Sequence, residues 1–149
     1  MNPAMLLPML LVLAAGGMIS LQAPTNAILA RAGGSPVIAA LISFAVGTLT
    51  LLLVWLATGP RPRVSAFAGL PPYAWFGGAY GALYVAVAAY AAPKIGLASL
   101  ITIGIAGQIA TALLLDHFGA LGLPRDPLSL GRAAGALLVI AGVVLVRRS

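Results

Sequence analysis

Long apolar runs, interrupted only by short groups of charged, Gly and Pro residues, make up most of the chain. The uncharged intervals are residues 1–30, 32–60, 64–93 and 95–115. A helix needs about 20 apolar residues to cross a bilayer, so each interval can hold one membrane-spanning helix and a short connection. The alternation of polar and apolar residues that membrane β-strands need is missing. The pattern therefore predicts helices that span a membrane.

Turn-forming residues between these runs set the ends of five predicted spans. The first two spans are separated by Gly33-Gly34-Ser35-Pro36, in which Ser35-Pro36 resembles a helix N-cap followed by a first-turn proline. The longest polar connection, residues 117–129, precedes the last span. The spans are approximately residues 5–30, 37–58, 72–92, 97–116 and 130–146, within a single transmembrane domain of residues 1–149. The predicted fold class is all-α integral membrane, with five transmembrane helices per chain.

Composition narrows the class of protein further. Of the 149 residues, 62% are hydrophobic and 7% are charged, whereas a soluble domain has about 25% charged residues. This excludes a water-soluble enzyme and a disordered chain, and it makes the lipid bilayer the expected environment. The net charge of +6 comes from scattered basic residues, so we expect no nucleic-acid partner. With no Cys and only His117, we expect no disulfide and no metal site in one chain.

The basic residues divide evenly between the two sides of the membrane, because five spans put the two termini on opposite sides. The side of the N-terminus holds Arg61, Arg63, Arg125 and Arg132, and the other side holds Arg31, Lys94, Arg147 and Arg148. An excess of Lys and Arg marks the cytoplasmic side. Equal numbers predict dual topology, in which half of the copies insert each way. The alternative is that a weak bias, for example from the loop at Arg61 and Arg63, sets one orientation.

Dual topology predicts an antiparallel (inverted) dimer, whose ten helices are related by a two-fold axis in the membrane plane. This is the inverted-repeat plan of many transporters, made here from two chains. The expected protein partner is a second copy in inverted orientation or a paired homologue.

Short motifs along the chain carry a family resemblance. They are Gln22-Ala-Pro-Thr-Asn26, Gly34-Ser-Pro36, Ile42-Ser-Phe-Ala-Val-Gly-Thr48, Gly77-Gly-Ala-Tyr-Gly81, Pro93-Lys-Ile-Gly96, Gly107-Gln108 and Leu115-Asp-His-Phe-Gly119. In this order they resemble the YdcZ-type family of bacterial five-helix proteins, which belongs to the drug/metabolite transporter superfamily. The resemblance implies a multi-pass protein of the bacterial inner membrane, paired or dual-topology halves and a ten-helix assembly. It implies no particular substrate.

Amide side chains within the spans are candidates for binding a solute. Gln22 and Asn26 are spaced i,i+4 and so project from one face of the first helix. Pro24 lies between them and is expected to kink the helix. Gln108 lies near the middle of the fourth span, where substrate sites of inverted-repeat transporters occur. The alternative is that these amides only join helices through hydrogen bonds.

Tyrosines and glycines extend this candidate site. Tyr80 and Tyr84 are also spaced i,i+4, near the middle of the third span and away from an interfacial aromatic belt. Two copies could line a chamber with rings, hydroxyls and amides, so the predicted substrate-binding residues are Gln22, Asn26, Tyr80, Tyr84 and Gln108. Small residues let helices approach closely. The predicted packing glycines are Gly77, Gly81, Gly104, Gly107, Gly131 and Gly135.

Asp116 is the one acidic residue next to a span, and we consider it a candidate for coupling to protons or cations. The alternative is an end-of-helix charge that pairs with Arg125 or Arg132. No catalytic set and no nucleotide-binding motif is present, so we expect neither an enzyme nor a cofactor.

The predicted function is secondary transport of a small polar, zwitterionic or aromatic metabolite or an organic cation. The alternative is a non-transporting membrane scaffold or assembly subunit. A pore is disfavoured, because no span has a polar stripe along one full face.

Overall fold

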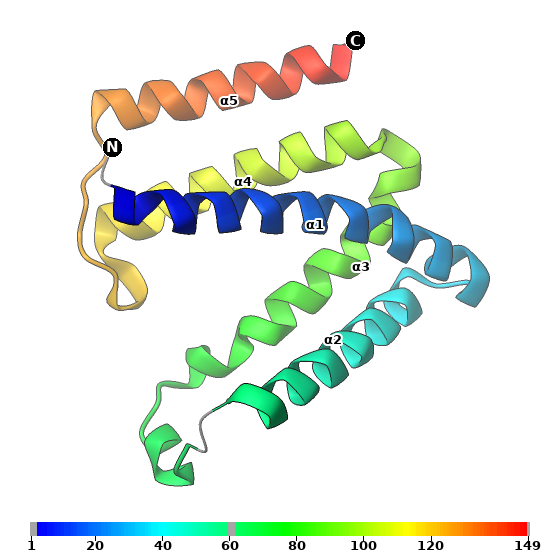
Figure 1. The fold of residues 1–149 in the computed structure, drawn as a ribbon. Helices are drawn as coiled ribbons and strands as arrows, with labels where there is room; N and C mark the ends of the chain where they lie inside the picture. Colours follow the sequence, from blue (N-terminus) through cyan, green and yellow to red (C-terminus); the bar gives the residue numbers. More distant parts are fainter. Residues whose placement is uncertain (1–2, 60–61, 149) are drawn as a thin grey trace. The chain divides into compact units, whose positions relative to one another are not determined.

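The computed structural model describes residues 3–59 and 62–148, and over these residues it is made of helices and connections without a strand (Figure 1). The α-helices are α1 (Pro3–Gly33), α2 (Pro36–Thr58), α3 (Gly77–Ile95), α4 (Leu97–Phe118) and α5 (Leu130–Arg148). Short 3-10 helices are η1 (Val64–Phe67), η2 (Pro72–Phe76) and η3 (Ala120–Gly122). The predicted all-helical architecture is therefore confirmed for the described part of the chain.

The helices match the predicted spans to within three residues at each end, with one exception. The third span was predicted to begin at residue 72, but Pro72–Phe76 forms the 3-10 helix η2 and α3 begins at Gly77. Within the described residues, four helical segments are long and apolar enough to cross a membrane: Met5–Gly33, Pro36–Thr58, Pro72–Ile95 and Leu97–Phe118. The fifth apolar segment, Leu130–Val146, is shorter, near the lower limit of about 17 residues for a spanning helix. The predicted basic loop includes Arg61, which lies outside the described residues.

The start of α2 is fixed by the predicted cap. Ser35 has an extended backbone (φ −153°, ψ 129°), and its Oγ accepts the backbone N–H of Val37 at 3.2 Å. Pro36 occupies the first helical turn, where its missing N–H leaves no hydrogen bond unmade. Gly34 makes the preceding turn with φ +70°, a conformation that favours glycine. The prediction from Ser35-Pro36 is thus confirmed.

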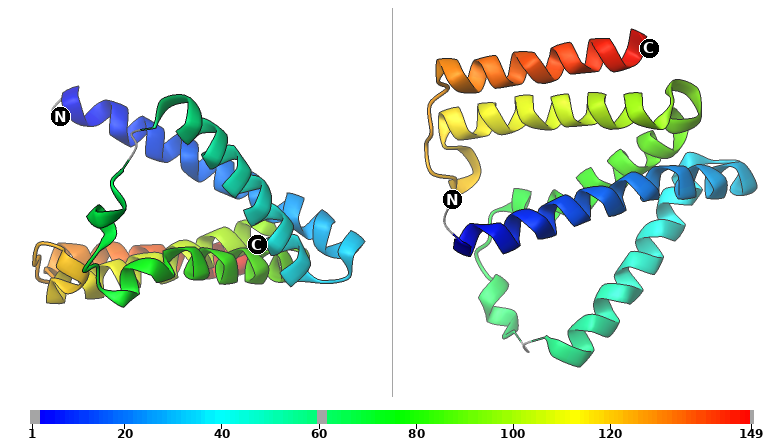
Figure 2. Two further views of the ribbon diagram at one scale, coloured as in Figure 1. Left: turned by 90° about the horizontal axis from the view of Figure 1, so that it is seen from below. Right: turned by 45° about the horizontal axis from the view of Figure 1, so that its top comes forward.

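The contacts divide the chain into two units, residues 1–94 and residues 95–149; the single transmembrane domain stays a prediction. In the first unit, α1 packs on α2, and the two helices diverge away from their connection (Figures 1 and 2). Their buried side chains include Ala23, Ala27, Ala39 and Ala40. Alanine permits close approach of helix backbones, so this interface is narrow.

The second unit is a helical hairpin. Gly96, with φ +81°, separates the end of α3 from α4. α4 and α5 run antiparallel and side by side (Figure 1, and the right view of Figure 2). Gly119 ends α4 in the left-handed conformation (φ 61°, ψ 35°), and its N–H bonds back to α4 carbonyls. The connection that follows returns the chain to α5.

The surface of the described chain is dominated by large apolar side chains. Leu13 and Leu130, for example, are 73% and 91% exposed. Soluble monomers rarely expose large continuous apolar patches, because water makes them costly. Since the buried core consists mainly of alanines while Leu, Ile and Val face outward, the surface suits contact with lipid hydrocarbon.

Candidate functional site

The first polar feature is the amide pair on α1. Gln22 Nε2 donates to the Oγ of Ser43 on α2 at 3.5 Å, a long hydrogen bond in a partly buried position. Asn26 is only 3% exposed, and its Nδ2 has no hydrogen-bond acceptor among the described residues. The two predicted site residues therefore differ: one amide joins α1 to α2, and the other is buried without an acceptor for its nitrogen.

The antiparallel register of α1 and α2 explains this difference. Gln22 pairs with Ser43, and four residues along each helix towards the connection lie Asn26 and Ala39. Ala39 is fully buried, with 0% exposure. Alanine has no side-chain acceptor, and the carbonyls of a helix interior are already engaged within the helix. The partner helix thus presents a hydroxyl to Gln22 and hydrocarbon at the level of Asn26.

The hydroxyl groups near this pair are engaged with the backbone of α1 itself. Ser20 Oγ donates to the carbonyl of Gly16 at 3.0 Å, and Thr25 Oγ1 donates to the carbonyl of Gln22 at 2.9 Å. Pro24 lies within α1, and the helix continues through it to Gly33. Because Pro24 has no N–H, it cannot make the helical hydrogen bond to the Ser20 carbonyl.

The predicted tyrosines lie one turn apart on α3. Tyr80 and Tyr84 are 65% and 39% exposed, and in the described chain neither hydroxyl forms a hydrogen bond, so none joins them to Gln22 or Asn26. A Cβ added to Gly81 would lie 3.1 Å from Cζ of Phe44 on α2. Gly81 is therefore a position of close approach between α3 and a side chain of α2.

Other predicted residues lie on open helix faces. Gln108 is an exposed residue of α4 in the second unit, and no hydrogen bond to it occurs within the described residues. Gly104 on the same helix is partly buried. A Cβ added to Gly77, Gly107, Gly131 or Gly135 would meet no atom within 4 Å. These four glycines pack against nothing in the described part of one chain.

The end of α4 carries a compact group of charges. Arg132 Nη2 lies 2.5 Å from Oδ2 of Asp116, and its Nη1 lies 3.0 Å from Oδ2 of Asp126. The backbone N–H of Asp126 also donates to the carbonyl of Asp116 at 2.8 Å. Arg132, at the start of α5, thus bridges the end of α4 and the connection before α5.

Arg125 and Arg132 were the two predicted partners of Asp116. In the structure Asp116 forms a salt bridge with Arg132. Arg125 instead donates from Nε to the carbonyl oxygen of His117 at 3.3 Å. Asp126 was not among the predicted site residues. Its proximity to Arg132 in the sequence was a signal, but only the folded connection brings both acids to one guanidinium.

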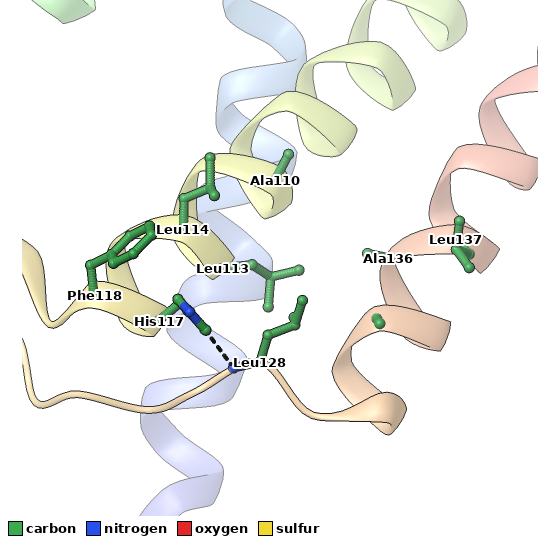
Figure 3. Close-up of a pocket in the computed structure, with 9 residues that line it drawn as sticks. Ala110, Leu113, Leu114, His117, Phe118, Leu128, Ala136 and Leu137 are labelled. Atoms are coloured by element: carbon green, nitrogen blue, oxygen red, sulfur yellow. Dashed lines mark hydrogen bonds between the residues drawn. The ribbon is translucent and has the colours of Figure 1, made fainter.

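An apolar groove, absent from the sequence prediction, lies between α4 and α5 in the second unit (Figure 3). Its volume is about 610 Å³, and its lining includes Leu113, Leu114, Phe118, Leu128 and Leu137. His117 is the polar residue in this lining, and its Nδ1 accepts the backbone N–H of Leu128 at 3.1 Å. The groove therefore offers mostly hydrocarbon, and its leucines had no sequence signal that distinguished them from lipid-facing residues.

The apolar helices and the exposed hydrocarbon surface define a multi-pass α-helical membrane protein. Residues 7–145 match the sequence model of the family described as "Putative inner membrane exporter, YdcZ". Because the match covers almost the whole chain, this protein belongs to that family and is a multi-pass inner-membrane protein. The predicted resemblance and location are confirmed, and the family description indicates a transporter rather than an enzyme. No curated protein and no solved structure matches the chain.

Proposed function

We propose that this protein is a secondary transporter that moves a small polar, zwitterionic or aromatic metabolite or an organic cation. The observation that carries the proposal is the match of residues 7–145 to a family described as exporters. The buried Asn26 supports it, because polar side chains at membrane depth face protein or a cavity. The proposed site comprises Gln22, Asn26, Tyr80, Tyr84 and Gln108.

The test is transport by the purified full chain reconstituted alone into lipid vesicles. A transporter carries a labelled solute into these vesicles faster than it enters protein-free vesicles of the same lipid. The competing function is a scaffold or assembly subunit, which moves no solute by itself. Absence of flux for every class of solute named above would therefore favour the scaffold.

We further propose an inverted dimer as the smallest transporting unit. The open faces at Gly77, Gly107, Gly131 and Gly135 support it, because a second copy could pack closely against them. The exposed amide of Gln108 supports it too, since a second chain would shield this polar group from lipid. Crosslinking and mass measurement in detergent, followed by vesicle assays of each species, test the dimer. A monomer with full transport activity would overturn it.

Asp116 is the proposed coupling residue of this transporter. Replacing it with Asn removes its negative charge while preserving its shape. If Asp116 couples protons, Asp116→Asn abolishes the dependence of transport on a pH gradient but leaves solute binding intact. An unchanged response to the gradient would leave Asp116 as an end-of-helix charge held by Arg132.

A further inference from the structure

The buried amide nitrogen of Asn26 is a donor without an acceptor. The side chain is 3% exposed, and no described residue accepts a hydrogen bond from Nδ2. The large majority of buried polar atoms in proteins have a partner, and an unpaired one calls for an explanation. In a bilayer the surrounding lipid cannot supply the acceptor. The acceptor that suits Asn26 must therefore come from a molecule other than the lipid.

The neighbouring groups on α1 and α2 do not supply it. Ser43 Oγ already receives the amide of Gln22, one helical turn away. The register places alanine on α2 at the level of Asn26, as described above. Asn26 is thus a buried donor, and no described residue accepts a hydrogen bond from its Nδ2.

We infer that Nδ2 of Asn26 donates to a carbonyl or carboxylate oxygen of the transported solute. This inference rests on the proposed transport function and narrows its substrate class. An amide nitrogen donates and does not accept, and an ammonium group likewise only donates. The two acids of the chain are Asp116 and Asp126, so α1, α2 and α3 contain no carboxylate to attract a cation. The Nδ2 donor therefore selects for an oxygen acceptor, and it forms no hydrogen bond with a cation that lacks one.

The same donor links solute binding to stability. Burying an unpaired donor disfavours the empty protein by about 5- to 150-fold relative to a protein with the donor paired. A solute oxygen removes this penalty, so a bound solute stabilises the folded protein. Pro24, two residues before Asn26, interrupts the hydrogen-bond ladder of α1.

Four probes that share a phenyl ring test whether binding depends on an oxygen acceptor in the solute. They are 3-phenylpropionate, 3-phenylpropanamide, phenylalanine and 2-phenylethylammonium, and only the last lacks a carbonyl or carboxylate oxygen. We expect the first three to raise the Tm of the purified full chain and to enter vesicles that contain it. We expect 2-phenylethylammonium to do neither.

Two variants test the role of Asn26 itself. Asn26→Leu has a similar volume and removes the unpaired donor, so the Tm of the empty protein stays the same or rises. Its affinity for the three oxygen-bearing probes falls by about 5- to 150-fold. Asn26→Asp replaces the donor with a carboxylate, and it reverses the preference in favour of 2-phenylethylammonium. Gln22→Leu is the contrast, since it removes the bond to Ser43 and lowers the Tm of the empty protein.

The outcomes distinguish this inference from the proposed function. If wild-type protein binds and moves none of the probes, both the transport proposal and the inference fail for this class of solute. If wild type transports the probes and Asn26→Leu does so equally well, transport stands and the inference is overturned. Dissociation of the dimer by Asn26→Leu, with a lower Tm, would show that Nδ2 donates to the second copy and would also overturn it.

Discussion

At the scale of single residues, Arg132 joins the end of α4 to the connection before α5. It contacts more groups than the spacing of charges in the sequence indicates. Its guanidinium contacts the carboxylates of Asp116 and Asp126 and also donates to the Asp126 carbonyl at 2.9 Å. The Asp116 and Arg132 side chains are each about one-third exposed, so water weakens each pair. A guanidinium that serves several acceptors gains more than an isolated surface pair, because its donors are fixed in a planar fork.

Arg132→Ala is therefore expected to lower the stability of the α4–α5 hairpin by about 1–2 kcal/mol, as it removes two ion pairs and one hydrogen bond to a carbonyl. The measurement is thermal or denaturant unfolding of the purified protein. Arg125→Ala is the matched control, because Arg125 makes a single 3.3 Å contact to a backbone carbonyl. Equal losses in the two variants would contradict the central role of Arg132.

Gly81 is a second residue at which a single added carbon atom is expected to lower stability. A Cβ here would lie 3.1 Å from the Phe44 ring, so Gly81→Val forces side chains on α2 and α3 apart. Overpacking of this kind costs about 1–3 kcal/mol. Gly78→Val is the control, since a Cβ at Gly78 meets no atom within 4 Å. The prediction is checked by comparing the unfolding of the two variants, and it fails if Gly81→Val is as stable as Gly78→Val.

At the scale of elements, the local signals that start and end helices are strong. Ser35→Ala removes the side-chain acceptor for the Val37 N–H at the start of α2. Loss of such a cap typically costs about 1 kcal/mol. We expect Ser35→Ala to lower the unfolding midpoint and Ser35→Asn to restore most of it, because Asn is an equally good cap. Equal midpoints for Ser35→Ala and wild type would show that Pro36 alone sets the start of the helix.

The sequence predicted the positions of the helices better than it predicted the contacts between them. The positions of charges and of Gly-Pro groups locate the helices, because a long uncharged segment has few alternatives to a membrane span. The face of α1 that carries Gln22 follows from helical spacing. That Ser43 receives its hydrogen bond while Asn26 meets alanine depends on the register of α2, which spacing within α1 does not determine.

The charged residues at the end of α4 were also predictable only in part, because some of their contacts depend on residues that are distant in the sequence. Asp116 and Arg132 could be named as partners, since both flank the connection. The inclusion of Asp126 depends on the path of that connection, which requires a left-handed Gly119 and a positive φ of 58° at Leu121. A non-glycine residue in that conformation has no reliable sequence signal. The apolar groove depends on the same path, because Leu128 is part of its lining.

At the scale of the whole molecule, one chain leaves polar and small residues on faces that would otherwise meet lipid. Gln108 is exposed, and the four open glycines described above, Gly77, Gly107, Gly131 and Gly135, lie on α3, α4 and α5. A lipid-facing amide is costly, because hydrocarbon supplies no hydrogen bonds. An inverted second copy could cover such faces on both chains at once. This arrangement requires that both orientations of the chain occur in the membrane.

The equal division of Lys and Arg between the two sides predicts that the chain inserts into the membrane in both orientations. Reporter fusions to Ser149 should give signal from both sides of the inner membrane, because neither side has an excess that would fix the orientation. Adding two or three Lys residues next to Arg63 should retain that loop in the cytoplasm and place Ser149 on the opposite side. Adding the same number next to Lys94 should do the reverse. A wild-type fusion that reports from one side only, with no response to the added charges, would contradict dual topology and require a parallel dimer or a paired homologue.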